Sequence, residues 1–312
     1  MDVLTVCFNA ILPLFFIMIT GYLARCLKLI REEDIGRINS LAYHFLIPIM
    51  LFYSTYTSPA KTAMNLNLLA FSLCSTLLTI LISIVFTLSV VKEKEKQGVI
   101  IHGLYRSNFA IVGMAIATSL VGADNVAPAA ALLVTAVPLN NISAVIIFET
   151  FNGKKVDVRQ IIIGIVKNPL LIGVVLGMIF SFMEIRLPEV INNTLSKVSQ
   201  ASTPLSLLML GAFFHFDNVK KYKKDLTMVC LGRLVVFPGI FLAIGYFMGF
   251  RGAEFAALIA LFSTSTVTVS FTMAQQLGGD SRLAGNIVVL TNLLFPFTVF
   301  LWSALYMYLG AF

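Results

Sequence analysis

Two short polar segments interrupt apolar stretches of the chain, and they hold the side chains best suited to binding a ligand. The first reads Arg-Ser-Asn-Phe-Ala-Ile-Val-Gly over residues 106–113, and the second reads Ser-Thr-Ser-Thr-Val-Thr-Val-Ser over residues 263–270. Amide and hydroxyl groups offer neutral hydrogen bonds, whereas an arginine inside an apolar stretch needs a partner or a cavity. Backbone amides at interrupted helices would add partial positive charge. Together these groups predict a binding site for an anion.

Nine residues are candidates for this site, most of them in the two segments. They are Arg106, Ser107, Asn108, Gly113, Thr264, Ser265, Thr266, Asn141 and Pro48. A structural interpretation stands beside the functional one. Serine and threonine can bond to their own helix, Pro48 can bend a helix, and Asn141 can join two helices by hydrogen bonds. Arg106 can also extend toward cytoplasmic phosphates.

The composition places these segments in an all-α polytopic membrane protein. Hydrophobic residues make up 58% of the 312 residues and charged residues only 12%, compared with about 25% charged residues in soluble domains. A soluble protein this apolar would aggregate, and disordered, fibrous and nucleic-acid-binding proteins are excluded as well. Since a transmembrane helix needs about 20 apolar residues, the sequence predicts ten spans: residues 3–24, 36–57, 66–91, 98–120, 126–150, 160–183, 194–215, 226–248, 253–275 and 283–310.

The cations between these spans are distributed unequally. The connections that follow spans 1, 3, 5, 7 and 9 carry fourteen Lys or Arg residues, among them Lys154, Lys155 and Lys221, and the alternate connections carry three. The positive-inside rule places the richer side in the cytoplasm and both termini on the extracytoplasmic side.

The two halves of the chain are related by an offset of 156 residues. Aligned pairs include Gly21 with Gly177, Pro48 with Pro204, and Ser107 with Ser263. Each half (residues 1–156 and 157–312) contains five spans, an odd number, so the second half must enter the membrane from the opposite side. Inverted repeats of this kind are typical of secondary transporters, whose sites lie near interrupted helices at the bilayer midplane. We therefore expect spans 4 and 9 to be discontinuous and to cross near Asn108 and Ser265.

The acidic and metal-binding residues exclude other kinds of site. All fifteen Asp and Glu residues lie in loops or near predicted span ends, with Glu149 and Glu254 nearest the membrane interior, so the site should be neutral to positive. The cysteines lack the spacing of a disulfide framework or a zinc site. The histidines lie far apart, at His44, His102 and His215. With no nucleophile–base pair visible either, we expect no metal, no other cofactor and no enzymatic activity.

Several segments resemble the auxin efflux carrier family. Residues Ser107–Gly113 are similar to that family's asparagine-containing crossover motif, and Leu46–Phe52 resembles its second-helix motif. Phe148-Glu149 and the segment Ala274–Asp280 are similar to sequences of its prokaryotic members. With no long cytoplasmic loop, the chain resembles a bacterial malate-permease-type member.

The resemblance implies the fold of the bile acid/sodium symporter superfamily. Spans 1, 2, 6 and 7 would then form a scaffold, and spans 3, 4, 5, 8, 9 and 10 a transport domain. Asn108 would contact a substrate carboxylate, and the protein would form a homodimer with spans 2 and 7 as the interface. One departure is that the family's crossover prolines are absent, since Ala115 stands in span 4 and Ser265 or Thr266 in span 9.

The residues and the resemblance together predict a secondary carrier that exports or exchanges small organic anions, such as malate, across the cytoplasmic membrane. Movement of one domain would expose a single site to each side in turn, in an elevator-like manner. Two alternatives stay open: a sodium-coupled symporter of organic or bile acids, and a membrane sensor built on a transporter scaffold. The expected partners are a small organic anion and the lipid bilayer, without nucleic acid.

The cation asymmetry makes the orientation testable. A reporter fused after Phe312 should give an extracytoplasmic signal, and one inserted at Lys221 a cytoplasmic signal, because fourteen loop cations lie on one side and three on the other. Alkaline phosphatase fusions report the extracytoplasmic side, and green fluorescent protein fusions report the cytoplasmic side. A cytoplasmic signal at Phe312 would contradict the odd number of spans in each half.

Overall fold

The computed structural model describes residues 3–57, 65–151, 158–214 and 220–311, and within these ranges the chain forms helices and connections without β-strands. Lys154, Lys155 and His215 lie outside these ranges. The α-helices with bounds are α1 (Val3–Cys26), α2 (Glu32–Leu41), α3 (Ile47–Tyr56), α4 (Leu66–Val90), α5 (Lys94–Tyr105), α6 (Met114–Val121), α7 (Ala127–Thr150), α8 (Val158–Lys167), α9 (Pro169–Phe182), α10 (Glu189–Phe213), α12 (Lys223–Leu231), α13 (Phe237–Phe247), α14 (Gly252–Phe262), α15 (Val269–Leu277) and α16 (Ser281–Tyr308). Shorter elements are the π-helical turns η1 (Ala42–Leu46), η2 (Phe109–Gly113) and η4 (Gly232–Val236), and the 3-10 turn η3 (Ala123–Asn125).

These elements agree in position with the predicted spans, since each of the ten predicted ranges contains helix. Within the described chain, five stretches are long and apolar enough to cross a bilayer: Glu33–Tyr56, Leu66–Val90, Ala127–Thr150, Lys223–Phe247 and Ser281–Tyr308. Shorter apolar helices are Leu12–Cys26, Pro169–Phe182 and Gly252–Phe262. The protein is therefore a multi-pass membrane protein, while the ten-span inverted repeat stays a prediction.

The long helix α4 shows how the chain suits a lipid environment. Its residues Thr79 and Ser83 are buried, and their hydroxyls donate to the carbonyl oxygens four residues earlier at 2.7 and 2.6 Å. Leu77 and Leu81, by contrast, are exposed on the outer face. In water this distribution would be unfavourable. In hydrocarbon it is favourable, because apolar side chains face the lipid and the hydroxyls of Thr79 and Ser83 are satisfied inside the protein.

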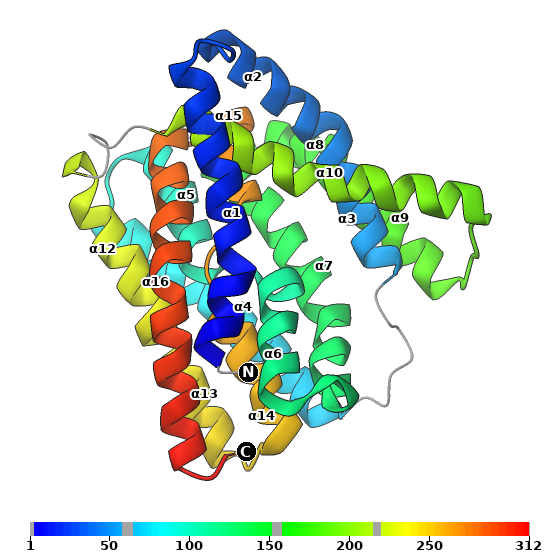
Figure 1. Cartoon of the computed structure of the whole chain (residues 1–312), viewed down its shortest axis with the longest axis vertical. Coiled ribbons are helices and arrows are strands. Elements are labelled where there is room, and N and C mark those ends of the chain that lie inside the picture. The colour runs from blue at the N-terminus through cyan, green and yellow to red at the C-terminus, as the bar shows by residue number, and fades with distance from the viewer. Residues whose placement is uncertain (1–2, 58–64, 152–157, 215–219, 312) are drawn as a thin grey trace.

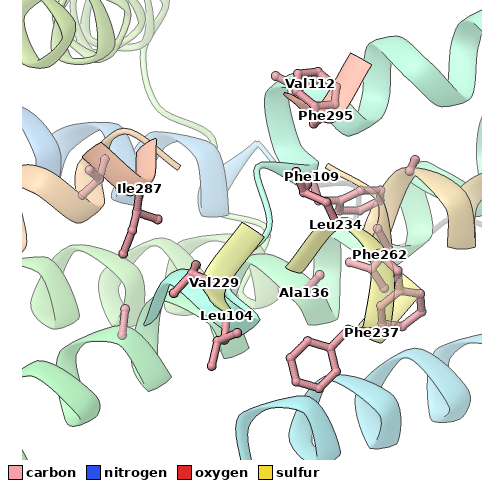
Figure 2. Packing of buried hydrophobic residues seen from close by; sticks show 14 of the residues in the cluster. Leu104, Phe109, Val112, Ala136, Val229, Leu234, Phe237, Phe262, Ile287 and Phe295 are labelled. Atoms are coloured by element: carbon pink, nitrogen blue, oxygen red, sulfur yellow. The ribbon is translucent and has the colours of Figure 1, made fainter. Parts of the chain in front are cut away.

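Two helical paths stop inside the protein. α5 ends at Tyr105 and helix resumes at Phe109, while α14 ends at Phe262 and α15 begins at Val269. Both interruptions fall in the polar segments singled out from the sequence. The largest cluster of buried apolar residues surrounds them, and Figure 2 shows part of it, including Phe109 and Phe262 beside the breaks. Rigid packing thus holds the ends of the broken helices in place.

Glycines allow two pairs of helices to pack with their backbones in contact. α1 packs against α10, which crosses it in Figure 1, and α9 packs against α3. A Cβ added at Gly21 in α1 would overlap the carbonyl oxygen of Leu208, and one at Gly177 in α9 would crowd that of Phe52. Gly177 and Leu208 lie 156 residues after Gly21 and Phe52. The two contacts are therefore equivalent under the offset found in the sequence.

The start of α1 and the end of α16 both lie in the lower half of Figure 1. An even number of membrane crossings between them would produce this arrangement, and ten were predicted. The side of the membrane that they face stays a prediction from the loop cations.

The helix contact at Gly21 can be tested by adding one methyl group. Alanine forms helix better than glycine by about 1 kcal/mol, yet Gly21→Ala should lower the free energy of unfolding by about 1–3 kcal/mol, because the methyl group meets backbone. Thermal unfolding of the purified protein in detergent measures this. The matched control is Gly36→Ala in α2, where nothing lies within 4 Å of the added Cβ. Equal losses in both variants would contradict the close contact.

Candidate functional site

The two helix breaks meet each other. The backbone N–H of Asn108 donates to the carbonyl oxygen of Ser265 at 2.9 Å. The hydroxyl of Ser107 donates to the carbonyl oxygen of Leu261 at 2.7 Å and lies 2.7 Å from that of Thr264. From the other break, the hydroxyl of Thr266 donates to the carbonyl oxygen of Gly103 at 3.0 Å. Each broken segment thus satisfies polar groups that the other leaves open, which is necessary because an unpaired backbone group at membrane depth is costly.

α16 supplies the other partners of the second break. The hydroxyl of Ser265 donates to the side-chain oxygen of Asn292 at 2.9 Å, and the side-chain amide of Asn292 donates to the carbonyl oxygen of Thr266 at 3.4 Å. The hydroxyl of Thr291 accepts from the backbone N–H of Thr266 at 3.3 Å. No proline stands at residues 106–113 or 263–270. The helices stop here because short polar side chains give the backbone other partners.

A cavity of about 470 Å³ lies in front of the breaks. Its residues come from the first break and the start of η2, from the second break and the start of α15, from α7, and from α3 and α10. They are Met50, Leu51, Ser54, Arg106, Ser107, Asn108, Phe109, Ala110, Ala136, Val137, Asn140, Asn141, Ser199, Gln200, Thr203, Pro204, Val267 and Val269. Among these described lining residues, Arg106 is the one with an ionised side chain. The cavity therefore combines one cation, several neutral polar groups and an apolar remainder.

Arg106 is buried at the wall of this cavity with most of its hydrogen-bonding capacity unused. The side chain is 8% exposed, and its Nη2 donates to the side-chain oxygen of Asn141 at 2.5 Å. Its Nε and Nη1 are buried and lack a hydrogen-bond partner in the described part of the chain. Unpaired guanidinium donors in a protein interior are expensive. An anionic acceptor in the cavity would relieve this cost.

Two asparagines add neutral groups beside Arg106. Asn108 is 6% exposed, and none of the hydrogen bonds found within the described ranges involves its side-chain amide. The side-chain oxygen of Asn140 is likewise buried without a partner among those residues. Phe109 and Val269, the first residues of the helical segments that follow the breaks, also line the cavity. The backbone N–H groups of such first turns are unpaired within the helix and favour negative charge.

The structure brings together some of the nine candidates and separates the others from the cavity. Arg106, Ser107, Asn108 and Asn141 line it. Thr264, Ser265 and Thr266 are fully buried behind it and bond to the first break or to α16. Gly113 packs against the backbone of Ala260, and Pro48 packs against Gly173 in α9. It is Pro204, the repeat partner of Pro48, that lines the cavity.

Two groups of residues were missing from the sequence candidates. Ser54 of α3, and Ser199, Gln200 and Thr203 of α10, form the wall opposite the breaks. A signal for this wall was present in predicted span 7. Its polar residues Ser199, Gln200 and Thr203 are spaced by three and four positions, so they share one face of the helix. The second omission is Arg233, which is 1% exposed inside predicted span 8. An arginine at such depth is itself a sign of a functional position.

The pairing of Arg106 with Asn141 leads to a stability test on the protein without ligand. Asn141→Leu should lower the free energy of unfolding by about 1–3 kcal/mol, because the guanidinium loses its last partner. In the double variant Arg106→Met/Asn141→Leu both polar partners are gone, so its stability should return to that of the parent or exceed it. Thermal unfolding in detergent compares the three proteins. A double variant less stable than Asn141→Leu would contradict the assignment of Arg106 as underpaired.

Comparison with known proteins adds two findings. A family model described as a membrane transport protein matches residues 6–160 and 156–303, which together span nearly the whole chain. A protein of Methanothermobacter thermautotrophicus (strain Delta H) described as an uncharacterized transporter is 22% identical over 297 residues, which cover 95% of this chain and 97% of that protein.

Proposed function

The chain belongs to the auxin efflux carrier-type family of membrane transport proteins, and we propose that it is a secondary carrier of small organic anions, carboxylates such as malate among them, in the cytoplasmic membrane. It is a transport protein and not an enzyme. The observation that carries the choice of substrate is Arg106, a buried cation on the cavity wall with two unpartnered donor atoms.

The charge of the cavity favours an anion over a cation. Its ionised wall group is Arg106, and none of its lining residues within the described ranges is Asp or Glu. The first turns that begin at Phe109 and Val269 add partial positive charge. Proteins that bind cations at membrane depth commonly place a carboxylate there. A carboxylate ion would supply the acceptor that these groups lack.

The polar groups also fit the geometry of a carboxylate. Its two oxygens can accept from neighbouring guanidinium donors, and charged hydrogen bonds of this kind are stronger than neutral ones. The amide of Asn108 can donate to the same group without carrying charge. The remaining wall includes Leu51, Val137 and Val267, which can contact a short carbon skeleton. Ser199 and Gln200 on the opposite wall can bind a hydroxyl or a second polar group of the substrate.

The cavity lies between two groups of helices that the proposal assigns to different bodies. On one side are the breaks and α7, and on the other are α3 and α10. The amino-terminal ends of α5, α12 and α16 are linked to one another. Lys96 pairs with Asp225 at 3.2 Å, and the hydroxyl of Tyr222 donates to Asp280 at 2.7 Å. Burial raises the pKa of Tyr222, so this hydroxyl keeps its proton. Helices linked in this way can move past the scaffold and carry the cavity wall with them.

A flux assay separates this proposal from the two alternatives. Protein reconstituted in liposomes should move malate down its gradient, and unlabelled mono- and dicarboxylates should compete with it. A sensor would bind the anion without flux, and a sodium-coupled symporter would move it only with sodium. If none of the carboxylates in the panel binds or crosses the membrane, the proposed substrate class is wrong.

Arg106→Gln tests the residue on which the proposal rests. The loss of a hydrogen bond to a charged group costs about 1.5–3 kcal/mol, so affinity for malate should fall by about 10- to 150-fold. Dianions should suffer more than monoanions, because the missing charge matters more to them. Binding of matched mono- and dicarboxylates to purified, folded protein measures both effects, with Arg37→Gln on the exposed face of α2 as the control. Unchanged affinity and selectivity would contradict the proposal.

Asn108→Ala completes this test. It should weaken carboxylate binding without the shift between dianions and monoanions, since the amide is neutral. Backbone hydrogen bonds of Asn108 to Ser265, Val112 and Gly113 do not depend on its side chain, so folding should be largely preserved.

A further inference from the structure

Arg233 is a buried cation that the anion site does not use. It lies in η4 and is 1% exposed. Each nitrogen of its guanidinium faces a main-chain oxygen: Nε donates to Thr264 at 3.0 Å, Nη1 to Tyr105 at 3.3 Å and Nη2 to Leu261 at 3.5 Å. In contrast to Arg106, no nitrogen of Arg233 is left without a partner. Its role is therefore toward the protein itself.

The three carbonyl oxygens belong to the ends of the two broken helices. Tyr105 is the last residue of α5, Leu261 lies in the last turn of α14, and Thr264 stands in the break that follows. The carboxyl end of a helix carries partial negative charge and unpaired carbonyl groups. In transporters with broken helices, such carbonyl ends are where sodium ions or protons are held. Here the carboxyl ends of α5 and α14 surround the guanidinium of Arg233 instead of a bound ion.

We propose that Arg233 is a built-in cation that takes the place of a dissociable alkali cation at the carboxyl ends of α5 and α14. Its guanidinium holds the two breaks together, so the cavity in front keeps its shape without a bound coupling cation at this position. The inference rests on the proposed function only in treating that cavity as an anion site. Arg233 acts there as a positioning residue.

The local sequence explains why the side chain reaches this position. A Cβ at Gly232 would lie 2.5 Å from the end of the Leu104 side chain, so glycine lets η4 approach α5 without displacing this leucine. Pro238 lacks the N–H that would bond to the carbonyl oxygen of Leu234, and the indole N–H of Trp302 in α16 donates to that oxygen at 3.0 Å. The π-helical turn is thus held from both sides, and Arg233 points between the breaks.

Arg233 is linked to the cavity through a shared acceptor. The carbonyl oxygen of Leu261 accepts from both Arg233 and the hydroxyl of Ser107, and Ser107 lines the cavity next to Arg106. Loss of Arg233 would release this oxygen and the ends of both helices. The positive charge behind the breaks also lowers the affinity of this region for a metal cation and supports an anion in front of it.

The first test concerns the cation requirement of the unmodified protein. Its thermal unfolding in detergent should be the same in sodium chloride, potassium chloride and N-methyl-D-glucamine chloride at equal ionic strength. Malate flux in liposomes should likewise proceed without sodium or potassium. A saturable stabilisation by either alkali cation, or a flux that requires one, would overturn the proposal.

The second test removes the charge. Arg233→Gln keeps hydrogen-bond donors but not the cation, and its unfolding temperature should fall by about 5 °C or more. Millimolar guanidinium or sodium chloride should restore part of this loss, whereas N-methyl-D-glucamine chloride should not, because its cation is too large for the vacated space. Arg233→Lys, which keeps the charge, should be more stable than Arg233→Gln. The control Arg37→Gln removes an exposed guanidinium and should show neither the loss nor the rescue.

Three results would overturn the proposal at this stage: a Gln variant as stable as the parent, a Lys variant no better than Gln, or equal effects of all added cations. If Arg233→Gln yields no folded protein, Arg233→Lys and the cation series on the parent protein decide the matter. The unfolding readout uses no substrate. The two proposals can therefore fail separately. If the protein shows no anion flux but its stability does not depend on alkali cations, the proposed function is contradicted and this inference is not.

Discussion

The structure depends on how the chain pairs the backbone groups at the two points where helices stop inside the membrane. A helix that crosses hydrocarbon without interruption satisfies its own amides and carbonyls, whereas a broken one leaves several exposed. Here the two breaks lie against each other, and Ser107 and Thr266 each reach across to the other segment. Asn292 of α16 and Arg233 of η4 supply the remaining partners. The polar residues inside these spans are there because the breaks need them.

The guanidinium of Arg106 stays underpaired, and this side chain lines the cavity. Arg233 has a carbonyl oxygen opposite each nitrogen, but Arg106 has one partner for three nitrogens. The buried guanidinium of Arg106 is therefore unfavourable for stability, whereas that of Arg233 is fully paired. If the cavity binds an anion as proposed, a site of this kind would hold its shape before the ligand arrives, and binding would require little rearrangement of the protein. Stability and binding are in this sense opposed at Arg106.

The sequence predicted the helical class, the positions of the elements and the two segments in which helices break. These features follow from local properties: apolar length, polar side chains at membrane depth, and an offset that aligns the halves. The sequence could not assign roles within the second segment, because Ser265 and Thr266 find their partners on α16 and in the first break. Their hydroxyls suggested ligand binding, and in the structure they donate to Asn292 and to the carbonyl oxygen of Gly103, while a role in binding stays a prediction. The wall formed by Ser199 and Thr203 was missed for the same reason, since its position depends on how α10 crosses the molecule.

The contacts of Arg233 also bear on how the protein is made. Two of its three acceptors, on Leu261 and Thr264, belong to the predicted span that is synthesised after its own. An arginine near the middle of a span costs about 2.5–3.5 kcal/mol during insertion by the translocon, and until the next span arrives only one of the three acceptors of Arg233, the carbonyl oxygen of Tyr105, has been synthesised. Predicted span 8 would therefore enter the bilayer at a cost, and its arginine would gain its full set of acceptors only when predicted span 9 has followed. The order of synthesis and the position of one guanidinium thus couple the insertion of predicted span 8 to that of predicted span 9.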